Sequence, residues 1–227
     1  VFRPADNGTD WSEVDSGMRH TKISSIVVSG TDLFAGTFNG VYFSENNGTS
    51  WSSTSFPSIN RSVDELVANG ANLFAGTLFA GIFLSTNNGT SWSKVSSGLT
   101  DTVVRSLAFS GTNLFAGTLS GSVFLSTNDG TSWSRVSSVL TNSDIRKLAI
   151  SGPNLFAATL GGVFLSSDNG TSWRNVSSGL TNPDVTSLAF SGTDIFAGTF
   201  GGVFLSTNNG TSWTAVNSGL TNPQVYS

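Results

Sequence analysis

The sequence predicts an all-β fold built from repeated four-stranded units, and three observations support this. Tryptophans recur along the 227 residues at spacings of 40 or 41. A short string of residues returns around each tryptophan, and a second string returns upstream. No stretch of ten residues keeps a helical period, whereas Asn-Gly and Asp-Gly pairs, which favour tight hairpins, separate short apolar runs. The tryptophans are Trp11, Trp51, Trp92, Trp133, Trp173 and Trp213.

The two recurring strings define one unit of about 40 residues. The string before the tryptophan reads Ser-Thr-Asn-Asn-Gly-Thr-Ser at residues 85–91 and 206–212, and residues 4–10 are a divergent copy. The upstream string, Leu-Phe-Ala-Gly-Thr, stands at residues 33–37 and 114–118, among others. Self-similarity at this fixed period indicates a repeat architecture.

Each unit is expected to contain four short strands, A to D, as in the fifth unit. Strand A covers Thr186–Ser191, strand B Ile195–Thr199, strand C Val203–Ser206 and strand D Ser212–Val216. Repeated four-stranded units of this length are typical of β-propeller blades. A sandwich or a solenoid could share the strand count, but neither explains why every unit closes with one tryptophan.

We expect residues 1–227 to form a single β-propeller domain of antiparallel blades with six blade positions. The sixth blade would be built from both termini, residues 1–22 and 217–227, because residues 1–14 match strands C and D and Val225 aligns with Val185. Such velcro closure would hide an edge strand. Seven blades are the alternative if the chain is a fragment. The five complete blades are expected at about residues 23–54, 63–95, 104–136, 145–176 and 185–216.

The composition excludes several classes of partner and site. The net charge is −4 without any block of like charges, which argues against a nucleic-acid or anionic-membrane surface. No cysteine is present, so disulfides and thiolate metal sites are excluded. The apolar runs are too short to span a bilayer. The start, Val1–Pro4, lacks a secretory signal and a Met, so we interpret the chain as mature or trimmed.

The string before the tryptophan resembles the Asp-box, or bacterial neuraminidase repeat, Ser-x-Asp-x-Gly-x-Thr-Trp, over essentially the whole chain. This box occurs in sialidases, xyloglucan-cleaving hydrolases, sortilin-like receptors and photosystem II assembly-factor-like propellers. The resemblance implies a structural box that shapes the C-to-D turn on the blade periphery, and it favours an extracellular or periplasmic location. The Asp position holds Asp6, Asn46, Asn87, Asn128, Asp168 and Asn208.

The chemistry of these residues agrees with a structural role. A short Asp or Asn side chain can cap backbone amides inside a turn, glycine supplies a positive φ, and tryptophan can pack between blades. Asn carries no charge, which weakens a metal role for these positions. We therefore expect no bound metal and no cofactor.

Candidate binding residues lie where the units differ. The D-to-A and B-to-C connections, on one face of a blade, diverge between units, whereas the boxes are nearly identical. Two guanidiniums, a carboxylate and a phenol on strand A could converge at one mouth of the central channel and hold an anionic or polyhydroxylated ligand. Ion pairing, exposure to water or neutral drift of the loops are the alternatives. The candidates are Asp64, Arg105, Arg146 and Tyr226, with Arg61 from the preceding connection.

An enzyme is not expected. A sialidase-like site needs three arginines, a tyrosine activated by a glutamate and an aspartate acid, and no glutamate is convincingly placed near Tyr226. The single His20 has no partners for a triad or a metal cluster. No glycine-rich phosphate loop precedes a helix.

These observations favour a non-catalytic scaffold that binds protein or glycan through its D-to-A face. A structural repeat domain without a dedicated ligand is the first alternative, and a degenerate sialidase-like glycosidase is the second. A homo-oligomer that completes the sixth blade is also predicted, because nearly identical blades permit strand exchange between chains.

Overall fold

The computed structural model describes residues 2–4, 10–18, 22–57, 62–137, 140 and 144–226. The chain divides into two compact units, Val1–Ser96 (unit 1) and Ser97–Ser227 (unit 2). All regular structure in the described residues is β-strand. No helix among them is long and apolar enough to cross a membrane.

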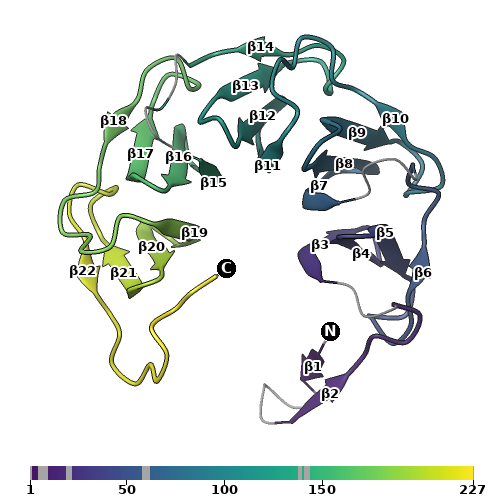
Figure 1. Cartoon of the computed structure of the whole chain (residues 1–227), viewed down its shortest axis with the longest axis horizontal. Coiled ribbons are helices and arrows are strands. Elements are labelled where there is room, and N and C mark those ends of the chain that lie inside the picture. The colour runs from purple at the N-terminus through teal and green to yellow at the C-terminus, as the bar shows by residue number, and fades with distance from the viewer. Residues whose placement is uncertain are drawn as a thin grey trace. The chain divides into compact units, whose positions relative to one another are not determined.

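Unit 1 holds one hairpin and two four-stranded sheets (Figure 1). The hairpin pairs β1 (Phe2–Pro4) with β2 (Trp11–Glu13). Blade 1 consists of β3 (Ile23–Ser29), β4 (Asp32–Thr37), β5 (Gly40–Ser44) and β6 (Ser52–Ser53). Blade 2 consists of β7 (Val63–Asn69), β8 (Asn72–Thr77), β9 (Ile82–Ser85) and β10 (Ser93–Lys94).

Unit 2 holds three sheets of the same form. Blade 3 consists of β11 (Val104–Ser110), β12 (Asn113–Thr118), β13 (Val123–Ser126) and β14 (Ser134–Arg135). Blade 4 consists of β15 (Ile145–Ser151), β16 (Asn154–Thr159), β17 (Gly162–Ser166) and β18 (Arg174–Asn175). Blade 5 consists of β19 (Val185–Ser191), β20 (Asp194–Thr199), β21 (Gly202–Ser206) and β22 (Thr214–Ala215).

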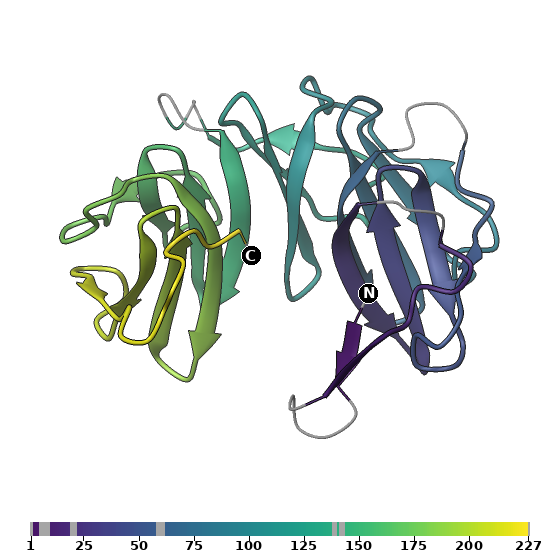
Figure 2. The ribbon, with the colours of Figure 1, turned by 60° about the horizontal axis from the view of Figure 1, so that its bottom comes forward.

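The predicted all-β fold of five complete four-stranded antiparallel blades is confirmed. Each sheet is a meander in which consecutive strands pair, and Figure 2 shows the connections gathered at the two ends of each sheet. Strand D is shorter than predicted, with two residues in blade 5 instead of the expected Ser212–Val216. The reason is that residues 206–212 form their own hydrogen-bonded turn, which leaves little of strand D to pair with strand C.

Successive blades within a unit pack strand A of one blade against strands A and B of the blade before it. A Cβ on Gly36 would lie 2.8 Å from a Val63 methyl group, so the glycine of the upstream string permits this close approach. Ser25 adds a polar contact, because its hydroxyl accepts the Leu66 amide at 3.1 Å. Ser106 and Leu148 repeat this contact at 3.0 Å between blades 3 and 4.

The C-terminal segment takes the same place beside blade 5. The Val225 amide donates to the Thr199 carbonyl at 3.0 Å, and the Thr186 hydroxyl donates to the Val225 carbonyl at 2.7 Å. Ser24 makes the matching bond to the carbonyl of Val63, the first residue of β7. Val225 therefore stands where strand A of a further blade begins, as its alignment with Val185 predicts. Velcro closure with the N-terminal hairpin stays a prediction.

The tryptophans pack against the connection that precedes their blade. The amide of Trp51 donates to the Ser16 carbonyl at 2.8 Å, and that of Trp213 donates to the Ser178 carbonyl at 2.9 Å. Both side chains are 4% exposed. A glycine, Gly17 or Gly179, follows each serine at positive φ, and a Cβ there would collide with the tryptophan carbonyl. Where a connection carries a Ser-Gly pair, that pair thus docks the next hairpin.

Candidate functional site

The Asn or Asp of each box lies inside the C-to-D turn and holds it closed. Asn46 Oδ1 accepts the Ser50 amide and the Ser44 hydroxyl, both at 2.9 Å, and its Nδ2 donates to Ser50 Oγ at 2.9 Å. Ser44 Oγ in turn accepts the Gly48 amide at 2.9 Å. Asn47 and Gly48 take φ of 55° and 82°, as expected for the hairpin. The same arrangement recurs around Asn87, Asn128 and Asn208.

Asp168 fills the same turn with a charged group. The Ser172 hydroxyl and amide donate to its carboxylate at 2.5 and 2.9 Å. These bonds, together with the Ser166 hydroxyl, lower the pKa of Asp168 from 3.8 to about 2. Asp6 and the Trp11 side chain lie outside the described residues. Within the described part of the chain, no group of three or more His, Asp or Glu residues could hold a metal ion.

The D-to-A and B-to-C connections share one end of each blade, which we call the loop end. Exposed large apolar side chains gather there: Phe38 and Phe79 in unit 1, and Leu119 and Leu160 in unit 2, all in B-to-C connections. The described A-to-B and C-to-D turns, at the opposite end, expose none. Among the residues that the structure describes, the other exposed large apolar ones are Leu220 and Tyr226 after β22, Ile26 and Val28 on β3, and Val216.

The predicted strand A candidates sit at a β-bulge. The pairing of strands A and B shifts register between Val104 and Ser106, so Arg105 is the bulged residue. Arg146 and Asp64 occupy the bulges of β15 and β7. A bulge redirects a side chain away from the regular pleat. Asp64 belongs to unit 1, and Arg61 lies outside the described residues.

In unit 2 the two arginines form ion pairs, which is one of the alternatives to ligand binding. Arg105 Nε lies 3.7 Å from Asp144, and Arg146 lies 3.9 Å from the same carboxylate. Arg146 also reaches Asp184 at 3.3 Å. Neither aspartate was among the predicted site residues. Their position directly before strand A, shared by Asp144 and Asp184, was the available signal.

Tyr226 contacts the same group of residues through Phe200. Its ring packs edge-on against Phe200 at 5.5 Å, and its hydroxyl donates to Gln224 at 3.1 Å. The Arg146 guanidinium lies 6.0 Å from the centre of the Phe200 ring. Of the five predicted binding residues, the structure therefore brings together Arg105, Arg146 and Tyr226.

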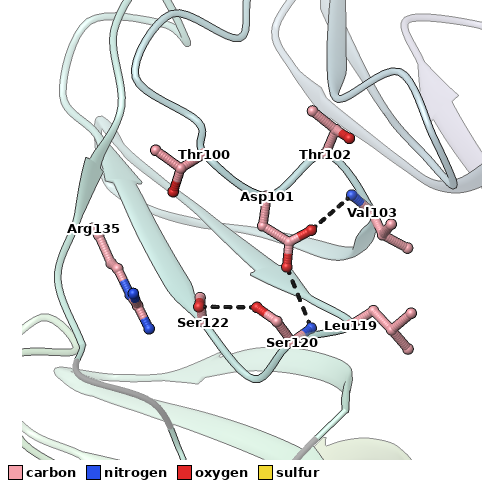
Figure 3. A pocket seen from close by; sticks show the side chains of 8 residues that line it. All are labelled: Thr100, Asp101, Thr102, Val103, Leu119, Ser120, Ser122 and Arg135. Carbon is pink, nitrogen blue, oxygen red and sulfur yellow. Dashed lines mark hydrogen bonds between the residues drawn. The ribbon is translucent and has the colours of Figure 1, made fainter.

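A separate pocket of about 640 Å³ opens at the loop end of blade 3. Figure 3 shows Asp101 on one side and Arg135 on the other, with Ser122 between them. None of these residues is among the binding residues that the sequence predicts. The pocket is lined by Thr100, Asp101, Thr102, Val103, Leu119, Ser120, Ser122 and Arg135.

Asp101 ties the two connections of blade 3 together. One carboxylate oxygen accepts the Val103 amide at 3.1 Å, and the other accepts the Ser120 amide at 3.3 Å (Figure 3). Burial acts to raise the pKa of Asp101, but these amides and the Ser120 and Thr118 hydroxyls together lower it below 3.8. The carboxylate is therefore charged at neutral pH and engaged by the protein itself.

Comparison with known proteins identifies the family. The model of the DUF6242 β-propeller domain matches residues 1–106 and again residues 105–226. The chain belongs to the DUF6242 β-propeller domain family. No curated protein matches it.

Solved structures similar to this DUF6242 propeller share its fold at low sequence identity. The computationally designed Ika8 protein is 14% identical with a TM-score of 0.64, over 84% of this chain and 60% of that one. An ancestral GH74 enzyme is 22% identical with a TM-score of 0.77, and the chain spans 33% of its length while 99% of this chain is covered. YCF48 bound to D1 peptide is 18% identical with a TM-score of 0.75, over 97% of this chain and 76% of that one.

Proposed function

We propose that this domain is a non-catalytic scaffold that binds an extended segment of another protein at the loop end of unit 2. The observation that carries the proposal is the uneven distribution of exposed apolar side chains. Leu119 and Leu160 are 42% and 41% exposed at matching positions of neighbouring blades, and the half-buried Phe200 stands at the third. The opposite turns of the described blades expose no such residue. Exposed apolar residues gathered on one end mark interaction surfaces.

A protein segment fits this end better than a small molecule does. The same blades carry ion-paired charges at the start of strand A, on Arg105, Asp144, Arg146 and Asp184, and Arg146 lies 6.0 Å from the centre of the Phe200 ring. Apolar and charged groups together suit a chain that presents side chains at regular intervals. A propeller of similar fold, YCF48, is known bound to D1 peptide, which supports a peptide in preference to a glycan.

The absence of enzymatic activity is part of this proposal. Arg105 and Arg146 are ion-paired, so neither guanidinium is available to grip a substrate carboxylate without breaking a pair. The Tyr226 hydroxyl donates to Gln224, an amide that cannot act as the base a tyrosine nucleophile needs. We also propose that the repeated turn is an Asp-box, on the strength of its shared hydrogen bonds.

Selection of peptides from a phage-displayed library on the whole chain tests the proposal. We expect peptides to be enriched, and Leu160→Ser to weaken their binding at least tenfold, because that side chain would lie under the peptide. Val28→Ser is the matched control, since Val28 is 59% exposed outside the loop end of its blade. Equal losses in both variants, or enrichment on a glycan array without peptide enrichment, would overturn the proposal.

The predicted homo-oligomer is a separate proposal with its own observation. Ile26 on β3 is 49% exposed, whereas Leu66, its counterpart on β7, is 2% exposed beneath blade 1. The face of blade 1 that carries Ile26 could therefore accept strands from a second chain. Completion of a sixth blade in this way stays a prediction.

A further inference from the structure

The three blades of unit 2 have nearly the same sequence, so a residue that differs at a matching position points to a feature particular to one blade. At the pocket of blade 3, Ser122 stands where blades 4 and 5 have Gly162 and Gly202. Arg135, paired with Phe124, stands where they have Asn175 and Ala215. Asp101 replaces the Asn182 and Asn222 that cap the same turn with one oxygen. These departures from the repeat surround a single cavity.

Asp101 and Arg135 differ in how far the protein itself satisfies their polar atoms. Both carboxylate oxygens of Asp101 accept backbone amides, those of Val103 and Ser120, so Asp101 stabilises the wall of the pocket. Arg135 uses only its Nε in a hydrogen bond, which it donates to the Ser137 carbonyl at 3.0 Å. Its two terminal nitrogens make no hydrogen bond to a described residue, and no described carboxylate lies within 4.0 Å. The bond at Nε fixes the guanidinium, and the Arg135 side chain lines the pocket (Figure 3).

Hydroxyl groups line the remaining wall. Ser122 is 4% exposed, and its hydroxyl shares a 3.1 Å hydrogen bond with Ser120 Oγ, which itself contacts Thr118 Oγ1 at 3.3 Å. Thr100 adds an exposed hydroxyl on the opposite connection. Leu119, 42% exposed, supplies an apolar border.

We propose that the blade 3 pocket is a subsite for a carboxylate, held by the outer edge of Arg135 and by the hydroxyls of Ser122 and Thr100. A planar guanidinium fork matches a carboxylate in two parallel hydrogen bonds. A sugar is less suitable, because its hydroxyls need acceptors and the Asp101 oxygens are already engaged. The assignment rests on the proposed function in one respect: the carboxylate belongs to an acidic side chain of the bound segment, whose methylene groups contact Leu119.

Acetate titration followed by NMR of the arginine side-chain Nε–Hε signals tests the subsite without any peptide. At constant ionic strength, the Arg135 signal should shift and saturate, while that of Arg174, on strand D of blade 4 outside this pocket, should not. Ser122→Gly, which installs the residue of blades 4 and 5, should weaken acetate binding several-fold without unfolding blade 3. Equal responses of the two arginines, no effect of Ser122→Gly, or saturation by glucose instead of acetate would overturn the proposal.

A second arm connects the subsite to the bound segment. A selected peptide with one Glu should lose at least fivefold in affinity when that residue becomes Gln, and the loss should vanish in Arg135→Asn, which carries the blade 4 residue. Saturable acetate binding in a chain that selects no peptides would sustain the subsite and refute the proposed function. Selected peptides whose affinity does not change when Glu becomes Gln would support the proposed function and refute the subsite.

Discussion

At the scale of single residues, the turn of each box depends on one oxygen placed to receive the backbone. Asn46 and Asp168 accept the amide of the serine four residues on at the same distance, 2.9 Å. Such a side chain caps the turn whether or not it is charged. The charge of Asp168 changes only how the turn responds to acid.

Acid should therefore affect the turn of Asp168 differently from the turns of Asn46, Asn87, Asn128 and Asn208. The folded pKa of Asp168, about 2, lies below its ordinary value of 3.8, so its contribution to stability is present above about pH 4 and lost as pH falls towards 2. We expect Asp168→Asn to flatten the decline in the free energy of unfolding between pH 4 and pH 2. Urea unfolding followed by tryptophan fluorescence measures it. Asn208→Asp, in the matching turn, should steepen the decline, and parallel profiles in all three proteins would contradict this.

The sequence predicts correctly those features that depend on neighbouring residues in the chain. It does not predict contacts between residues that are far apart in the chain and meet only in the folded structure. The positive φ of Asn47 and Gly48 follows from an Asn-Gly pair between apolar runs. The pairing of Arg105 with Asp144 does not, because the two residues are 39 positions apart and meet only when strands A of adjacent blades pack. The pocket at Arg135 does not follow either, because it forms only when strand D and the two connections at the loop end of blade 3 come together.

At the scale of elements, a connection that carries a Ser-Gly pair fixes the blade that follows it, as before Trp51, Trp133 and Trp213. Where the glycine is replaced, the next tryptophan packs differently. Pro57 stands at the glycine position before Trp92, whose indole nitrogen makes no hydrogen bond in the described structure. Phe56 packs edge-on against Trp92 instead, with ring centres 5.1 Å apart. Self-comparison of the sequence predicted the blades, but not this docking of one blade on the previous connection.

A substitution of Gly179 tests the docking. In Gly179→Ala the new methyl group would collide with the Trp213 carbonyl, in addition to the strain of a φ of 94°. We expect a loss of about 2–4 kcal/mol in the free energy of unfolding and a red shift of Trp213 emission. Gly192→Ala is the control, because φ there is 60° and nothing lies within 4 Å of the new Cβ. It should cost only about 1–2 kcal/mol, and equal losses would refute the docking role.

At the scale of the whole molecule, the residues that stabilise the blades are repeated, and those that we propose for binding are not. Boxes and upstream strings are nearly the same in every blade and hold the sheets, whereas the loop ends differ. A residue taken from the matching position of another blade should therefore leave the fold intact. Control variants can therefore be taken from the chain itself, because each substituted residue already occupies the matching position of another blade.

The most direct test of the account is the affinity of a selected peptide for a chain whose blade 3 loop end is taken from blade 4. In this variant Leu-Gly-Gly replaces residues 119–122, together with Asp101→Asn and Arg135→Asn. Calorimetric titration should show at least a tenfold loss of affinity, while the free energy of unfolding changes by no more than about 1 kcal/mol. A folded variant that binds the peptide as tightly as the natural chain would contradict the claim that recognition resides where the blades differ.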